Sequence, residues 1–294
     1  MANLKEVKNR ISSVMSTQQI TKAMKMVAAA KLRKSQEKIT QMRPFAQRLS
    51  HILNNLSAAQ LDNDSDNWYG RVSAEKKILI VAVSSDRGLC GSFNSNVFKG
   101  VAKLIQDNYQ AQYAKGDVTI LTIGRKASEY FSKRKVSCIN NYVSIFSGLT
   151  FDSVSEVAEL IMKEFKEGKF DKVELVYNEF RNVATQVLRT EQMLPIVPTK
   201  QETKAPEVDY IYEPNQEEIV VGLIPKMLKV QLFKALLDSN ASENGARMTA
   251  MDKATENAGE LLKELRLSYN RTRQAAITTE ILEIVAGAEA LKSA

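Results

Sequence analysis

The sequence predicts two long helices, one at each end of the chain, that pair as an antiparallel coiled coil with a small α/β domain inserted between them. Residues 1–57 contain no glycine and a single proline, Pro44, and residues 226–294 contain no proline. From about residue 75 to residue 198, short apolar runs alternate with segments of helical composition. Helix-forming ends and an alternating middle are typical of a coiled coil that carries a mostly parallel sheet.

The N-terminal helix is expected to cover residues 1–60, because alanine, methionine, lysine, arginine and glutamine dominate this segment. Its apolar residues recur at 4-3 spacing near both ends, which predicts a narrow seam against another long helix. These seam residues are Leu4, Val7, Ile11 and Val14, then Leu32, Ile39, Met42, Leu49, Leu53 and Leu56. Between the two groups the seam positions carry Gln18, Thr21, Lys25, Ala28 and Ser35. We expect this central span to leave the partner helix and contact something else.

The C-terminal helix, expected within residues 208–294, supplies that partner. Its last part repeats the 4-3 spacing with Ile277, Ile281, Ile284, Ala288 and Leu291. At 1.5 Å per residue the two helices would reach roughly 80 and 100 Å, which is longer than a small domain. We therefore expect an antiparallel coil that protrudes, with this C-terminal seam packed against the N-terminal seam. An all-α bundle of shorter helices is the alternative, and the lack of turn signals in residues 1–57 disfavours it.

The middle of the chain, residues 75–200, is predicted to form a Rossmann-like α/β domain. Strands are expected at residues 77–84, 118–124 and 173–178, with weaker candidates at 136–139 and 186–194. Helices are expected at residues 95–113, 126–134 and 153–168. Alternation in this order predicts a mostly parallel sheet with right-handed crossovers. Polar, proline-containing or acidic segments, residues 62–73 and 199–215, bound the domain.

The positive charge of the chain is concentrated on one helix. The net charge is +7, and residues 1–50 hold eleven lysines and arginines against Glu6 and Glu37. Such a helix fits an acidic protein surface, a membrane surface or nucleic acid, or it is simply a solvated face. Nucleic acid is disfavoured because Phe45 is the only aromatic residue in this segment.

One segment resembles a ligand site. Residues 84–92, Ser-Ser-Asp-Arg-Gly-Leu-Cys-Gly-Ser, follow the first predicted strand, where open α/β sheets usually bind ligands. The spacing Gly88-x-x-Gly91 is neither a dinucleotide fingerprint nor a P-loop. Cys90 could act as a nucleophile at a helix N-terminus, or the glycines could simply form a tight turn. No paired carboxylates, metal cluster or catalytic triad is recognisable, so we expect no catalytic residue, cofactor or metal.

Three further segments carry a family resemblance. They are residues 20–31 (ITKAMKMVAAAK), residues 85–91 (SDRGLCG), and the C-terminal group 246–251 (ARMTAM), 269–278 (YNRTRQAAIT) and 283–288 (EIVAGA). Together with the helix–α/β–helix layout, they resemble the gamma subunit of the F-type ATP synthase over essentially the whole chain. The resemblance implies a central rotor shaft with no active site of its own. Such a shaft rotates inside the catalytic hexamer and couples proton flow through the membrane ring to ATP synthesis or hydrolysis.

The resemblance also implies partners and contact residues. The expected partners are the alpha and beta subunits of the hexamer, the epsilon subunit and the membrane c-ring, with one copy of the chain per complex and no nucleic acid. The expected location is the cytoplasmic side of a bacterial inner membrane, as a peripheral protein. The residues expected to contact the hexamer are Met24, Lys25, Arg247, Gln274 and Thr278, and those expected to contact the ring are Tyr210 and Glu213. The alternative function is an α/β enzyme or nucleotide-binding protein that uses the Gly88–Gly91 turn.

Overall fold

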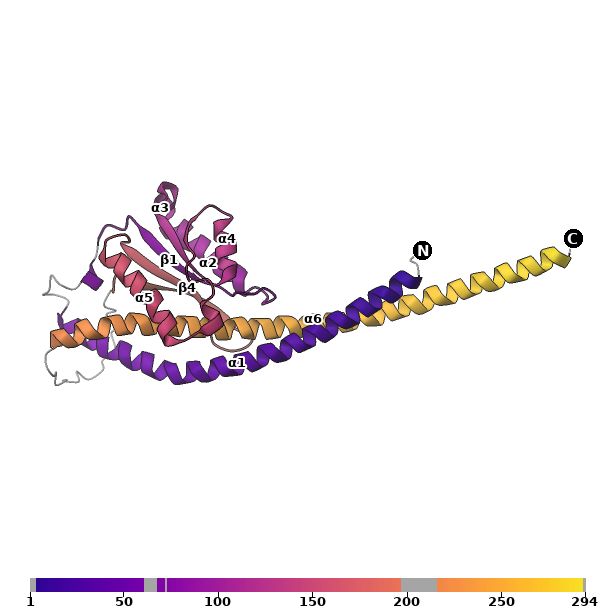
Figure 1. Cartoon of the computed structure of the whole chain (residues 1–294), viewed down its shortest axis with the longest axis horizontal. Coiled ribbons are helices and arrows are strands. Elements are labelled where there is room, and N and C mark those ends of the chain that lie inside the picture. The colour runs from indigo at the N-terminus through magenta and orange to yellow at the C-terminus, as the bar shows by residue number, and fades with distance from the viewer. Residues whose placement is uncertain (1–3, 61–67, 72, 197–215, 293–294) are drawn as a thin grey trace. The chain divides into compact units, whose positions relative to one another are not determined.

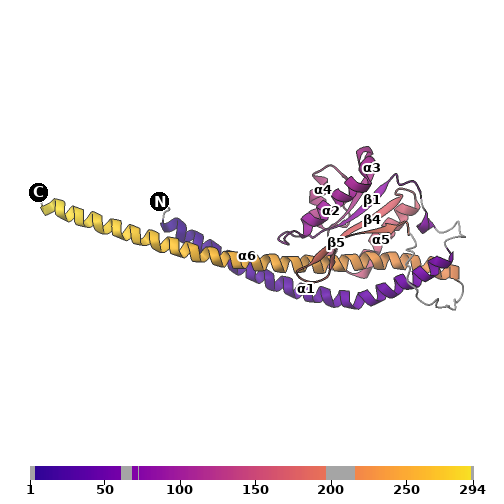
Figure 2. The same ribbon diagram turned by 180° about the vertical axis from the view of Figure 1, so that it is seen from behind.

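The computed structural model describes residues 4–60, 68–71, 73–196 and 216–292, with backbone alone for 50–60 and 216–221. The chain divides into two compact units. We call the first, residues 4–28 with 248–292, the terminal coil, and the second, residues 29–247, the α/β unit. Two helices, α1 (Leu4–Gln60) and α6 (Gln216–Lys292), belong to both units (Figures 1 and 2). The division at 1–60, 75–200 and 208–294 stays a prediction.

The α/β unit contains one five-stranded sheet in the order β3-β2-β1-β4-β5. The strands are β1 (Ile78–Val83), β2 (Val118–Ile123), β3 (Ser137–Ile139), β4 (Lys172–Phe180) and β5 (Gln186–Leu194). The first four are parallel to their neighbours, and β5 is antiparallel to β4. Both the mostly parallel sheet and all five strand positions are as predicted. Every residue of β1 is buried because both faces of the sheet are covered.

The helices of the α/β unit pack on the two faces of the sheet (Figures 1 and 2). They are α2 (Phe93–Asn108), α3 (Gln110–Lys115), α4 (Arg125–Ser132) and α5 (Phe151–Lys166). Ile78 and Ile80 of β1 pack with α2 and α4, whereas Leu79 and Val81 pack with α5 and α6. Two short 3-10 segments, Trp68–Gly70 and Ile145–Gly148, complete the described elements. Because side chains along β1 alternate between the two faces of the sheet, they contribute to two separate hydrophobic cores.

The prediction of a single helix over residues 95–113 is wrong in one respect, because the helix is interrupted between α2 and α3. Tyr109 leaves helical geometry at φ −129° and ψ 25°. Its side chain is buried, and its hydroxyl donates a hydrogen bond to Oε1 of Glu174 at 2.8 Å. Burial of this ring and its bond to β4 compensate for the interrupted helix. The break gives α3 a direction of its own.

Within the α/β unit, α1 and α6 run antiparallel. Ser35 Oγ donates to Asn240 Oδ1 at 2.7 Å, and Arg43 Nη2 lies 3.0 Å from Asp238 Oδ1. The same Arg43 nitrogen donates to the carbonyl oxygen of Phe180 at 2.7 Å. Arg43 therefore joins α1, α6 and the end of β4.

The terminal coil is also antiparallel, and its seam does not leave the partner helix as we expected. Gln18 Nε2 donates to the carbonyl of Thr255, the hydroxyls of Thr21 and Thr255 lie 2.8 Å apart, and Lys25 pairs with Asp252. Every 4-3 position of α1 from Leu4 to Ala28 is buried or half-buried. The expectation was wrong because small and hydrogen-bonding side chains continue the seam where apolar ones stop.

The C-terminal seam prediction is also wrong. Ile277, Ile281, Ile284 and Leu291 are 47–83% exposed. The buried or half-buried 4-3 positions of α6 are instead Met251, Thr255, Ala258, Leu262, Leu265, Tyr269, Thr272 and Ala276. Ile277 is one residue out of phase with that series, so it faces about 100° away. With Lys25 opposite Asp252, the start of α1 lies opposite about residue 273 of α6, and the last turns of α6 have no partner in α1.

Candidate partner-contact surfaces

The end of α6 in the terminal coil exposes a dense group of apolar side chains. Six large ones are at least 47% exposed, namely Ile277, Ile281, Leu282, Ile284, Val285 and Leu291. Among the described residues of α6, none beyond Leu262 is buried. Exposed apolar surface of this extent marks an interaction site. We call these six residues the apolar end of α6.

Two of the expected contact residues lie at the start of this apolar end. Gln274 and Thr278 are both exposed, one turn apart on α6. The Thr278 hydroxyl donates to the carbonyl oxygen of Gln274 at 2.9 Å, which satisfies the hydroxyl within the helix. The Gln274 side chain is therefore the more available of the two for a partner.

The outward face of α1 in the terminal coil combines apolar and basic side chains. Met15, Ile20, Met26 and Val27 are 41–60% exposed. Of the two expected contact residues here, Met24 is half-buried beside the seam, and Lys25 forms an ion pair with Asp252 at 2.5 Å. The Lys25 side chain remains 40% exposed. This face can contact a partner that offers both apolar and acidic groups.

In the α/β unit, residues 84–92 form a tight turn between β1 and α2. Asn94 Oδ1 accepts a hydrogen bond from the backbone N–H of Ser85 at 3.0 Å. Leu89 and Gly91 both adopt left-handed backbone geometry, at φ +63° and +57°. Glycine at position 91 adopts that geometry without a side-chain penalty, whereas Leu89 is strained and is 64% exposed at the tip.

Arg247 attaches this turn to α6. Its Nη2 donates to the carbonyl oxygens of Arg87 at 3.0 Å and Gly88 at 3.3 Å, and its Nη1 lies 2.7 Å from Oε1 of Glu243. The Arg247 and Glu243 side chains are only 12% and 11% exposed. Burial raises the pKa of Glu243, and Arg247 opposes that rise. Most of the hydrogen-bonding capacity of Arg247 is thus used within the chain, and its contact with the hexamer stays a prediction.

The thiol of Cys90 is not arranged as a nucleophile. The residue is 2% exposed, and its sulfur accepts a hydrogen bond from Asn94 Nδ2 at 3.2 Å. Burial raises the pKa of the Cys90 thiol, so the thiolate is disfavoured at neutral pH. Among the described residues, no group of three histidine, cysteine, aspartate or glutamate side chains could hold a metal ion. Burial and protonation of the thiol therefore disfavour the Cys90 nucleophile of the enzyme alternative.

Comparison with known proteins identifies the family. A family model described as ATP synthase matches residues 3–291. An ATP synthase gamma chain from Cytophaga hutchinsonii is 55% identical, with each chain covered completely. One from Flavobacterium psychrophilum is 53% identical over 99% of this chain and 100% of its own length. The chain belongs to the ATP synthase gamma-chain family.

Solved structures of ATP synthase stalks have a similar architecture. A central-stalk structure of the mitochondrial ATP synthase of Tetrahymena thermophila, which includes the c-ring, aligns with a TM-score of 0.59 at 28% identity. The alignment covers 80% of this chain and 99% of that one. A rotor structure from Euglena gracilis aligns with a TM-score of 0.65 at 20% identity, over 93% and 98% of the two chains, and supports the fold alone. As a gamma subunit, the chain is part of the central stalk, which is the rotor of the synthase. The enzyme is the whole complex and not this subunit.

The sequence reasoning missed two residues of the apolar end, Leu282 and Val285, because they lie off the 4-3 pattern. A signal was present, since apolar residues at 281, 282, 284 and 285 cover more than one stripe of the helix. A helix that is apolar over so much of its circumference needs partners on several sides. The predicted ring contacts Tyr210 and Glu213 lie outside the described residues. No helix in the described ranges is both long enough and apolar enough to cross a bilayer.

Proposed function

We propose that this gamma subunit is the rotating shaft through which an ATP synthase couples proton flow across a membrane ring to ATP synthesis or hydrolysis in a surrounding hexamer. The observation that carries the proposal is the apolar end of α6, which no part of α1 covers. Six large apolar residues exposed on one helix mark a surface that a partner covers. A collar of alpha and beta subunits that surrounds the helix provides apolar contacts on every side.

The hexamer contacts are proposed at Met24 and Lys25 on α1 and at Arg247, Gln274 and Thr278 on α6. Gln274 and Thr278 are exposed beside the apolar end, where a collar would meet them. Met24 and Lys25 share α1 with the excess of basic residues, which favours acidic loops of the catalytic subunits. Arg247 is proposed as a hexamer contact by resemblance, and it also bonds the carbonyl oxygens of Arg87 and Gly88, next to the exposed Leu89.

The other partners are proposed from the family. A solved relative includes the c-ring beside its central stalk, which supports a ring contact for this chain as well. The contact is assigned to Tyr210 and Glu213 by resemblance. An epsilon subunit, a single copy per complex and a peripheral position on the cytoplasmic side of a bacterial inner membrane complete the proposal. The many bacterial gamma-chain relatives support the bacterial setting.

A charge placed in the apolar end tests the shaft proposal. Ile284 is 72% exposed, so Ile284→Asp should leave the thermal unfolding of the isolated chain within about 1 °C of wild type. In the assembled synthase the same carboxylate would be desolvated by the collar. We therefore expect at least a fivefold loss of ATP-driven proton pumping in membrane vesicles, while Ile284→Leu pumps normally. Normal assembly and pumping in Ile284→Asp would exclude an apolar collar at this position.

A further inference from the structure

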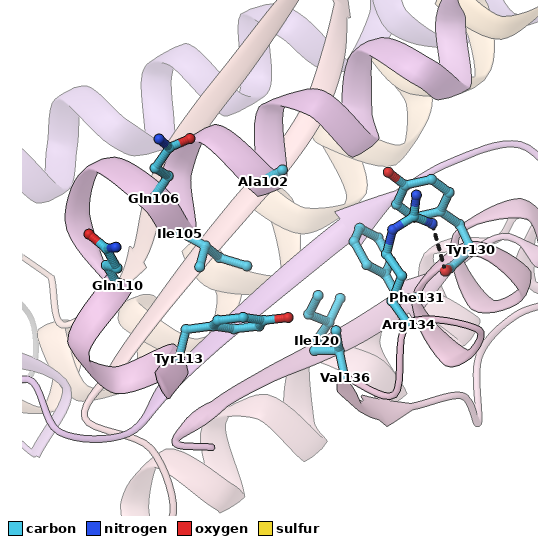
Figure 3. Close-up of a pocket in the computed structure, with 10 residues that line it drawn as sticks. All are labelled: Ala102, Ile105, Gln106, Gln110, Tyr113, Ile120, Tyr130, Phe131, Arg134 and Val136. Carbon is cyan, nitrogen blue, oxygen red and sulfur yellow. Dashed lines mark hydrogen bonds between the residues drawn. The ribbon is translucent and has the colours of Figure 1, made fainter. Parts of the chain in front are cut away.

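The α/β unit contains a small cavity, open to solvent, beside its edge strand β3. Its volume is about 270 Å³. Its walls are Ala102, Ile105, Gln106, Gln110, Tyr113, Ile120, Tyr130, Phe131, Arg134 and Val136, which come from α2, α3, β2, α4 and the segments that follow them (Figure 3). Ile120 and Phe131 are core residues with at most 4% exposure, so the cavity reaches the hydrophobic core. It is close to the lower limit of ligand pockets, roughly 300 Å³.

The break between α2 and α3 forms this cavity. If the helix continued through Tyr109, the Tyr113 ring would follow the direction of α2. Instead, α3 carries Tyr113 across the space in front of Ile120 and Val136, and its hydroxyl points toward them (Figure 3). Two hydrogen bonds hold α3 there. The Tyr109 hydroxyl donates to Glu174, and Gln112 Nε2 donates to the carbonyl oxygen of Glu75 at 2.9 Å. These bonds hold α3 in place, and the Tyr113 side chain that it carries is 45% exposed.

The polar groups of the cavity lie at its two ends. Gln106 and Gln110 are at one end, and Arg134 is at the other, beside the rings of Tyr130 and Phe131 (Figure 3). The Arg134 guanidinium carbon lies 3.6 Å from the centroid of the Tyr130 ring, and Nη1 donates to the Tyr130 carbonyl oxygen at 3.4 Å. No described carboxylate forms an ion pair with Arg134, and Lys133 and Lys135 add positive charge beside it. The Phe98 ring stacks on Tyr130 with 4.1 Å between the ring centroids, so both faces of the Tyr130 ring are covered within the chain. A guanidinium beside an apolar wall matches the carboxylate of a small organic anion.

We propose that this cavity binds a small aromatic carboxylate, with its ring between Tyr113 and the apolar floor of Ile120 and Val136 and its carboxylate on Arg134. The volume limits the ligand to a single ring with a short acidic side chain.

The probe is 3-(4-fluorophenyl)propanoate, with its amide as the uncharged comparison, titrated into the full chain and followed by fluorine NMR. We expect saturable binding of the acid, at least fivefold tighter than that of the amide. The methyl signals of Ile105, Ile120 and Val136 should shift together as the acid is added. Equal affinity for acid and amide, or shifts confined to other methyl groups, would overturn the proposal.

Arg134→Gln and Lys133→Gln are matched variants, because both remove one cation from an exposed position and only Arg134 lines the cavity. Arg134→Gln should abolish the preference for the acid and leave amide binding unchanged, whereas Lys133→Gln should change acid affinity less than twofold. The same titration is then made with the assembled synthase. Retained binding supports a ligand site, and loss of binding would mean that another subunit occupies the cavity and would overturn the proposal.

Discussion

Two arginines join elements of the α/β unit through backbone acceptors and buried carboxylates. Arg43 connects α1 with Asp238 of α6 and with the carbonyl of Phe180, and Arg247 connects Glu243 with the turn at Arg87 and Gly88. Asp238 is fully buried, and its Oδ2 has no hydrogen-bond partner among the described atoms. Such pairs stabilise a particular arrangement more than they stabilise folding itself.

The burial of Asp238 predicts a pH dependence of stability. Desolvation raises the pKa of Asp238, and Arg43 opposes that rise without cancelling it. A carboxyl with a raised pKa binds its proton more tightly when folded, so stability is lost as the pH rises from the ordinary carboxyl pKa, about 4, toward the higher folded value. Measured by urea unfolding, wild type should therefore lose stability relative to Asp238→Asn as the pH is raised from about 4 to 7. The opposite trend would mean that Arg43 determines the pKa.

Met24 allows a test of coupling apart from stability. A half-buried Met24 tolerates lysine at a modest cost, because methionine and lysine have similar helix propensity. If Met24 faces an acidic loop of the hexamer, Met24→Lys creates an ion pair that must break at each rotary step. A partly desolvated pair of about 1–3 kcal/mol would slow each step severalfold to a hundredfold.

The measurements for Met24→Lys are ATP hydrolysis and proton pumping by the synthase, and thermal unfolding of the isolated chain. We expect hydrolysis to be retained and pumping to fall, with unfolding little changed and Met24→Leu normal in all three. A large loss of thermal stability with proportional loss of both activities would instead identify Met24 as a packing residue of the coil.

At the scale of elements, the terminal coil is held by a seam that changes chemistry along its length. Apolar positions near Val7 and Leu262 give way to the hydroxyl pair of Thr21 and Thr255. Polar seam residues contribute less to stability than apolar ones, and they can fix the alignment of two helices.

The hydroxyl pair predicts a characteristic mutant cycle. Replacing only Thr21 or only Thr255 with valine leaves the other hydroxyl with its backbone acceptor alone, at Met251 or Gln18, and should cost about 1 kcal/mol. Replacing both removes the polar groups together, and the double variant should be no less stable than either single variant. Urea unfolding of the four proteins gives the coupling energy. Strict additivity of the two losses would show that the hydroxyls do not interact.

The sequence predicted most of these elements but not the phase of the C-terminal seam. Apolar runs such as residues 78–83 predict strands well, because a short continuous apolar run is typical of a strand that is buried on both faces. The seam of α6 was assigned to Ile277 and Ile281, yet the coil uses Thr255, Ala258 and Thr272, which a search for large apolar residues does not detect. The hydrogen bonds between Arg247 and the turn at Gly88 join positions about 160 residues apart, so no local sequence pattern could predict them.

At the scale of the whole molecule, the chain combines a well-packed sheet with a helix end that has no internal packing. Isolated helices of such length are marginal in water. In the isolated chain, backbone amides of residues 277–292 should therefore exchange with solvent within seconds to minutes, while those of β1 and β2 stay protected for hours. After assembly into the synthase, the amides of 277–292 should become strongly protected. Equal protection before and after assembly would contradict enclosure by a collar.

Because α6 continues to Lys292 while α1 begins at Leu4, the two helices share any twisting load only up to about residue 273 of α6. Beyond that point torque passes through the peptide hydrogen bonds of a single helix. The torsional stiffness of a rod rises steeply with its radius, so a lone helix twists far more than a pair under the same couple. If a partner grips the helix near Lys292, elastic energy would therefore be stored preferentially in residues 274–292 of α6.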